Sequence, residues 1–182
     1  MPDLKKDHRG LRRRPLYTPL ALVIGSVIAV LLVTSWLIVS WGSTTVVLVR
    51  HAEQLAEGAD SSLSEAGRAH ARKLASLLEP AGLAAIYTTE LKRTRETASP
   101  VAEVTGIEPQ VIPADETGAL VRRLKWRHRG EAVLVVGHSN TVPAIADKLG
   151  APIGVVEADE YSGLWVISYS RLRGTRLLTL RY

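Results

Sequence analysis

The longest apolar run of the chain lies near its N-terminus, from Leu20 to Trp41, and its 22 residues include no charged side chain. As an α-helix rising ~1.5 Å per residue, the run would be roughly 33 Å long, which is enough to cross a hydrocarbon layer of ~30 Å. Tyr17 and Trp36 lie near its ends, where aromatic side chains settle at membrane interfaces. The pattern therefore predicts a transmembrane helix over residues 20–41.

The alternative interpretation of this run is a cleaved signal peptide, which has an apolar core of ~7–15 residues and a cleavage site of small residues. This run is longer, and the bulky Trp36 and Trp41 make poor cleavage sites. Residues 1–19 carry six Lys or Arg against two Asp, so the positive-inside rule places this basic tail in the cytoplasm. The prediction is a single-pass protein of the cytoplasmic membrane with residues 43–182 on the extracytoplasmic side.

Beyond residue 43, short β-branched runs alternate with segments whose apolar residues recur at helical spacing. The expected strands are 46–49, 85–88, 110–113 and 132–136, with a final antiparallel pair at 164–168 and 176–180. The expected helices are 64–78, 90–104, 118–128 and 141–149, the first with Ser64 as its N-cap. This alternation predicts a three-layer α/β/α sandwich with a mostly parallel central sheet.

Charge and cysteine content narrow the possible functions. The net charge is +5, but residues 1–19 supply +4 of it, and the other 17 basic and 16 acidic side chains nearly cancel. Binding of nucleic acid is therefore not expected. The absence of Cys excludes disulfides, zinc–thiolate sites and a cysteine nucleophile.

Two of the predicted buried strands end in a histidine, one in Arg50-His51 and the other in Gly137-His138. Because ligands of open α/β sheets bind at the carboxyl ends of strands, neighbouring strands would bring both histidines to one pocket. Arginine binds phosphate oxygens in a bidentate manner, and a neutral histidine can attack phosphorus. With Arg93 added, these residues could carry out phosphoryl transfer without a metal or another cofactor.

Four sequence elements surround these residues in a fixed order. Residues 50–53 read Arg-His-Ala-Glu, residues 63–67 read Leu-Ser-Glu-Ala-Gly, and residues 136–139 read Val-Gly-His-Ser. Residues 87–98 contain Arg93 four positions before Thr97-Ala98. Together they resemble the Arg-His-Gly-Glu, Leu-Thr-x-x-Gly, Gly-His and Ser-x-x-x-Arg-Ala-x-x-Thr-Ala motifs of the histidine phosphatases, the phosphoglycerate-mutase-like superfamily.

The resemblance implies that His51 is a nucleophile that is transiently phosphorylated. It implies that Arg50, Arg93 and His138 form the phosphate pocket, with Ser139 as a further substrate-binding residue. Ala52 stands where the family has Gly, and Thr97 is interpreted as a packing residue of its helix. The short segment between Thr97 and Gly137 favours a small phosphatase over a mutase, with a phosphorylated small molecule or a phosphoprotein as substrate.

The proton donor for the leaving group is left open among three acids. Asp115 is favoured over Glu116 and Glu53, although acids just before a helix also serve as caps. His70 and His128 lie on charged helices and are expected to be solvated.

Two other functions compete with the phosphatase. One is a metal-dependent hydrolase that uses His51, Glu53 and His138, although the flanking arginines disfavour a cation there. The other is a catalytically silent module that binds a phosphorylated ligand.

Overall fold

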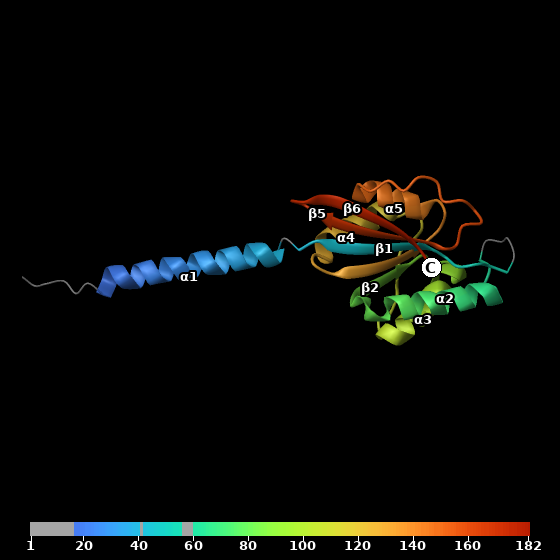
Figure 1. The fold of residues 1–182 in the computed structure, drawn as a ribbon, viewed down its shortest axis with the longest axis horizontal. Coiled ribbons are helices and arrows are strands. Elements are labelled where there is room, and N and C mark those ends of the chain that lie inside the picture. The colour runs from blue at the N-terminus through green and yellow to red at the C-terminus, as the bar shows by residue number, and fades with distance from the viewer. Residues whose placement is uncertain (1–16, 41, 56–59) are drawn as a thin grey trace, which may run out of the picture. The chain divides into compact units, whose positions relative to one another are not determined.

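The computed structural model describes residues 17–40, 42–55 and 60–182. The chain divides into two compact units, the second of which begins at Val39. Helix α1 (Tyr17–Ser40), most of which belongs to the first unit, contains a stretch, Leu20–Leu37, that is apolar and long enough to cross a membrane and has no buried residue (Figure 1). A signal sequence would share these properties. Trp41, the last residue of the predicted span, lies outside the described residues.

The second unit is built on one mixed sheet, and its described residues form six strands in the order β3-β2-β4-β1-β5-β6. The strands are β1 (Thr44–Arg50), β2 (Leu83–Thr88), β3 (Gln110–Val111), β4 (Ala132–Gly137), β5 (Gly163–Ser170) and β6 (Gly174–Arg181). Strands β1 to β4 run parallel, whereas β5 pairs antiparallel with both β1 and β6. The predicted mostly parallel sheet and the final antiparallel pair are confirmed.

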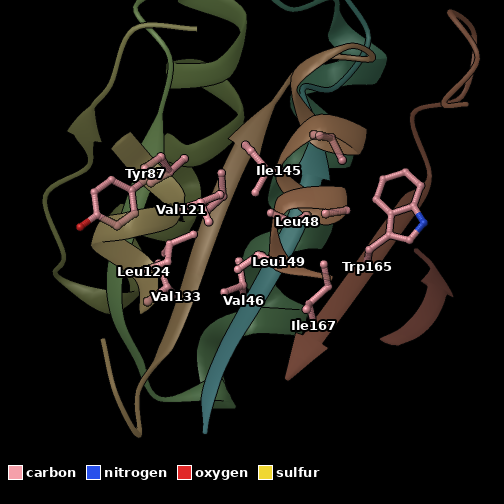
Figure 2. Packing of buried hydrophobic residues seen from close by; sticks show 14 of the residues in the cluster. Val46, Leu48, Tyr87, Val121, Leu124, Val133, Ile145, Leu149, Trp165 and Ile167 are labelled. Carbon is pink, nitrogen blue, oxygen red and sulfur yellow. The ribbon is translucent and has the colours of Figure 1, made fainter. Parts of the chain in front are cut away.

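Helices cover both faces of this sheet. They are α2 (Glu65–Leu78), which a short 3₁₀ turn η1 (Glu79–Ala81) follows, α3 (Lys92–Thr105), α4 (Thr117–Arg127) and α5 (Thr141–Leu149). Because successive side chains of a strand point to opposite faces, Val47 and Val49 of β1 pack in the cluster that includes α2 and α3. Val46 and Leu48 pack in the cluster that includes α4 and α5 (Figure 2). The predicted three layers are present in this unit.

Among the predicted boundaries that differ from the structure, two lie close to the segment before α4. The third strand was expected over residues 110–113 but pairs only at Gln110 and Val111, because Pro113 has no N–H to donate to a ladder. The helix predicted over residues 90–104, which precedes this strand, starts two residues later than expected, at Lys92. Glu90 instead accepts a hydrogen bond from the backbone N–H of Ala114 (3.1 Å) and links β2 to the segment before α4.

Candidate active site

The two strands that end in histidine are neighbours in the sheet. Parallel pairing of β1 and β4 places Arg50 opposite Gly137, and the backbone N–H of His51 donates to the oxygen of Gly137 at 2.9 Å. The rings of His51 and His138 are therefore 5.4 Å apart between centroids. The structure brings together the two histidines that the sequence placed at strand ends.

The imidazole of His51 is held in one orientation. Its Nδ1 lies 2.8 Å from the backbone oxygen of Ala52, and because a carbonyl can only accept, Nδ1 carries the proton. Burial lowers the pKa of His51 to about 4, and the positive charges of Arg50 and Arg93 act in the same direction. At neutral pH the ring is therefore uncharged, with its lone pair on Nε2, which is the form a nucleophile requires.

The loop after His51 is fixed by Ala52 and Thr97. The methyl group of Ala52 packs against Leu63 and Ala71 in a small buried cluster. Its N–H donates to the hydroxyl of Thr97 at 2.9 Å, and that hydroxyl donates to the oxygen of Arg93 at 2.6 Å. Ala52 has no positive φ, so glycine is not needed here. Thr97 is buried, as a packing residue would be, but it also ties this loop to the helix that carries Arg93.

Glycine is required at a different point of the same region. Ser64 caps α2 by accepting from the N–H of Gly67 at 3.0 Å, which confirms the predicted N-cap. A Cβ on Gly67 would lie only 2.1 Å from the backbone oxygen of Glu53. The Leu-Ser-Glu-Ala-Gly element thus lets the start of α2 approach the loop that follows His51.

Arg50 is oriented by a distant segment. Its guanidinium donates to the backbone oxygens of Glu157 (2.8 Å) and Glu160 (3.2 Å). It also lies over the ring of Tyr161, 4.3 Å from the centroid, and that ring is 6.0 Å from the ring of His51. Sequence reasoning missed Tyr161 because the segment before β5 carries no motif and lies more than a hundred residues from Arg50.

His138 is placed by threonines. Its Nε2 lies 2.9 Å from the hydroxyl of Thr89, which also bonds Thr94 at 2.9 Å, and its backbone N–H donates to Thr141 at 2.8 Å. Burial is the main cause that lowers the pKa of His138 to about 4, followed by the charge of Arg93, while Glu90 partly opposes the shift. Thr89 and Glu90 were not predicted as site residues, although their position directly after a buried strand was a usable signal.

The side chains of both histidines and of Arg50 and Arg93 line one cavity. It is lined by Arg50, His51, Gln54, Leu91, Arg93, Ala114, His138, Ser139 and Asn140. Asp115 is exposed beside the lining residue Ala114 and does not itself line the cavity, and Glu116 is also exposed. Apart from Leu91 and Ala114, the lining side chains are cationic or polar and can surround a phosphoryl group on several sides.

Glu53, His70 and His128 lie elsewhere. The carboxylate of Glu53 is 3.2 Å from Nδ1 of His70, whose Nε2 is 3.2 Å from the backbone oxygen of Tyr182. His128 is buried, with Nδ1 2.7 Å from Glu131 and Nε2 2.8 Å from the hydroxyl of Tyr87. The expectation that both histidines are solvated is wrong, because each sits against an aromatic ring and a carboxylate.

The position of Glu53 also bears on the metal-dependent alternative. That hypothesis needs Glu53 beside His51 and His138, but its carboxylate is bonded to His70. Within the part of the chain that the structure describes, no group of three or more His, Cys, Asp or Glu is arranged to hold a metal ion. The residues proposed as ligands therefore do not form a coordination set.

Comparison with known proteins gives a family match and several similar folds. Residues 46–116 match the model of the histidine phosphatase superfamily, branch 1, whereas a search of curated proteins gives no significant match. Among solved structures, a putative alpha-ribazole-5'-P phosphatase from Escherichia coli K-12 superposes with a TM-score of 0.64 at 18% identity, over 78% of this chain and 97% of that one.

Two further structures share the fold. The protein histidine phosphatase SixA complexed with tungstate has a TM-score of 0.61 at 16% identity, over 75% of this chain and 96% of that one. A putative phosphohistidine phosphatase SixA from Agrobacterium tumefaciens has a TM-score of 0.56 at 24% identity, over 76% of this chain and 99% of that one.

Proposed function

We propose that this chain, which belongs to the histidine phosphatase superfamily, is a membrane-anchored phosphatase that acts through a phosphohistidine at His51. Its enzyme class is that of a phosphomonoesterase of the superfamily. The observation that carries the proposed mechanism is the bond between His51 Nδ1 and the oxygen of Ala52. It leaves the Nε2 lone pair of a neutral imidazole at a cavity that Arg50, Arg93 and His138 also line.

The proposed reaction has two steps. In the first, Nε2 of His51 attacks phosphorus, the bond from phosphorus to the leaving group breaks, and the leaving group takes up a proton. In the second, water attacks the phosphohistidine, the P–N bond breaks, the conjugate base of the acid that protonated the leaving group takes up the proton of the water, and inorganic phosphate leaves with His51 restored. Arg50 and Arg93 balance the charge on the transferring oxygens, which is the main contribution a protein makes to phosphoryl transfer. His138 is uncharged at neutral pH in the free chain, and it gains a proton when a bound phosphate dianion supplies an opposite charge beside it.

The leaving group needs a proton donor, and we assign this role to Asp115. It directly follows Ala114, which lines the cavity, and its side chain is exposed rather than bound within the fold. Glu53 is engaged by His70. The structure adds Glu90 as a further candidate for the proton donor, since its negative charge raises the pKa of His138. The pair Asp115→Asn and Glu90→Gln separates the two candidates.

The proposed substrate is a phosphorylated small molecule or a phosphohistidine protein in the aqueous phase. The structures that share this fold include a putative alpha-ribazole-5'-P phosphatase, the protein histidine phosphatase SixA and a mycobacterial glucosyl-3-phosphoglycerate phosphatase. The substrates named for these proteins differ, so the fold alone does not select a leaving group. A panel of phosphorylated compounds offered to the purified chain would identify the leaving group that this cavity accepts.

We assign residues 20–41 as an uncleaved anchor and place residues 43–182 on the extracytoplasmic side. The support is the apolar, exposed stretch Leu20–Leu37 and the basic residues that precede it. A reporter that is active only in the cytoplasm, fused after Tyr182, should be silent. A strong signal, or a mature protein that lacks residues 1–41, would overturn the assignment.

The mechanism is tested by trapping the intermediate. Rapid quenching during turnover should yield an acid-labile, base-stable phosphoramidate that mass spectrometry locates on His51. His51→Ala should lose the adduct, whereas the control His128→Ala should keep it. A folded His51→Ala protein that retains the adduct and the activity would exclude the mechanism, and tight phosphate binding without turnover would favour the binding module.

A further inference from the structure

A cluster of basic and apolar side chains, all of them exposed except the half-buried Arg129, lies at the end of the sheet opposite the histidine pair. Trp126 is 58% exposed at the end of α4. The guanidinium of Arg171 lies 4.3 Å from its ring centroid, and that of Arg129 lies 5.0 Å away. Leu172 is 64% exposed in the turn from β5 to β6, between Arg171 and Arg173. We call these five residues the Trp126 patch.

Stability of the domain alone does not explain the composition of this patch. Stacking of Arg129 and Arg171 on the indole can stabilise the turn, but Arg173 is an exposed cation and Leu172 buries little surface. An exposed Trp and Leu beside three arginines suit a phospholipid headgroup layer, where amphipathic rings settle and guanidinium groups bind phosphate. Each basic side chain close to an anionic bilayer adds to this attraction.

The start of the domain lies at the same end of the sheet. A Cβ on Gly42 would lie 2.8 Å from Cα of Gly130, and the N–H of Thr45 donates to the oxygen of Glu131 at 2.8 Å. The chain therefore leaves the apolar run and passes directly beside the loop that holds Arg129. We propose that the Trp126 patch binds the anionic phospholipid headgroups of the membrane that holds residues 20–41. This proposal rests on the anchoring proposed above.

Binding of the Trp126 patch to the membrane would orient the catalytic cavity relative to the bilayer. Strand β1 runs from Thr44 at the patch end to Arg50 at the cavity end. At ~3.3 Å per residue these six steps span about 20 Å. With the patch on the headgroups, the cavity opens away from the bilayer, and the enzyme receives its substrates from the aqueous phase.

The test uses the full-length chain, whose lack of Cys allows a single labelled position. An environment-sensitive fluorophore is attached at Leu172→Cys or, as the control, at Val155→Cys. Val155 is 83% exposed and lies two residues before Glu157, which contacts Arg50 at the cavity end. Both proteins are reconstituted in vesicles of phosphatidylcholine alone or mixed with phosphatidylglycerol, with a nitroxide on the lipid headgroup as quencher.

We expect the label at position 172 to be quenched several-fold more strongly than the label at position 155 in anionic vesicles, and less strongly in neutral vesicles. Replacing Arg129, Arg171 and Arg173 by Gln should remove the dependence on lipid charge and leave hydrolysis of a soluble aryl phosphate unchanged. Equal quenching at positions 155 and 172, or equal quenching in both lipids, would overturn the proposal. Protein that does not float with the vesicles would overturn the anchoring beneath it, and the hydrolysis assay reports separately on the phosphatase.

Discussion

The domain holds two pairs of histidines in contrasting surroundings. His51 and His138 face each other among Arg50 and Arg93, and the pKa of each falls to about 4, with burial as the largest cause. His70 and His128 are also largely shielded from solvent, but each has a carboxylate within hydrogen-bond distance, Glu53 for the first and Glu131 for the second.

The number of ring nitrogens with hydrogen-bond partners distinguishes a histidine suited to catalysis from one with a structural role. A carboxylate and an aromatic ring occupy both sides of His128, since Glu131 and Tyr87 use its two nitrogens. Among the residues that the structure describes, the hydrogen-bond partner of His51 is a backbone oxygen at Nδ1. A buried histidine with one committed nitrogen and arginines nearby is suited to attack phosphorus, whereas one with two committed nitrogens can only hold elements together.

The largest expected effect contrasts one member of each pair. His51→Ala should lower kcat by at least about 10⁴-fold, because the nucleophile is lost and no neighbour can replace it. His128→Ala should leave kcat within a few-fold of the parent, measured below its unfolding temperature. The comparison breaks if the two variants lose similar activity while folded, as judged by circular dichroism.

The next effect concerns the acid that serves His51. Asp115→Asn should slow hydrolysis of alkyl phosphates by ~10²–10⁴-fold and spare aryl phosphates, whose leaving groups need no proton. Glu90→Gln is the matched control and should change both substrate classes by the same small factor. Equal losses on both classes for Asp115→Asn would assign Asp115 to positioning or folding.

Two neighbouring arginines of α3 give a third contrast. Arg93 lines the cavity, whereas Arg95 is exposed. Arg93→Ala should reduce kcat/KM roughly ten- to hundred-fold, since charge-assisted hydrogen bonds worth about 1.5–3 kcal/mol are lost. Arg95→Ala should be neutral. Steady-state assays of both variants measure the effect. A larger loss of kcat/KM for Arg95→Ala than for Arg93→Ala would mean that Arg95, not Arg93, binds the phosphate.

Acid should destabilise the folded chain by protonating His51 and His138. The pKa of His51 and of His138 is near 6.5 in the unfolded chain and about 4 in the folded chain. Between these values the unfolded state binds more protons, so stability present above pH 6.5 is lost as the pH falls toward 4. Each histidine should contribute up to roughly 1.4 kcal/mol per pH unit in this window.

Urea unfolding of the chain in detergent across this range measures the effect. Replacing His51 and His138 together by Gln should flatten the pH dependence between pH 6.5 and 4. An unchanged slope in the double variant would mean that other groups cause the acid sensitivity and that the cavity histidines are hydrated.

The smallest expected effect is the loss of folding stability when His128, of the structural pair His70 and His128, is replaced. His128→Ala removes one hydrogen-bond partner of the hydroxyl of the buried Tyr87, which Arg123 also contacts, at a cost of about 0.5–1.5 kcal/mol. For a domain of this size, that corresponds to a fall in Tm of ~2–4 °C per kcal/mol. Restoring most of the lost Tm with an added Tyr87→Phe change would show that the lost hydrogen bond of the hydroxyl is the cause. No recovery would point to lost packing instead.

The sequence by itself determined the layers of the domain and the ends of its strands. Alternating β-branched and amphipathic segments require a sheet covered on both faces, and the histidines after residues 50 and 137 follow from strand polarity once β1 and β4 are neighbours. Ser64 as a helix cap and the exposed apolar helix near the N-terminus are likewise local properties. Each depends on residues a few positions apart, and for that reason each could be predicted.

Only the tertiary structure decided which polar groups complete the site. The stacking of Tyr161 on Arg50 joins positions more than a hundred residues apart, and no periodicity encodes it. The same holds for Glu53, which turns to His70 rather than to the cavity, and for His128, buried against Tyr87 on another element. Whether a histidine is solvated, structural or reactive depends on what packs over its two nitrogens, and that is fixed by long-range packing of the chain.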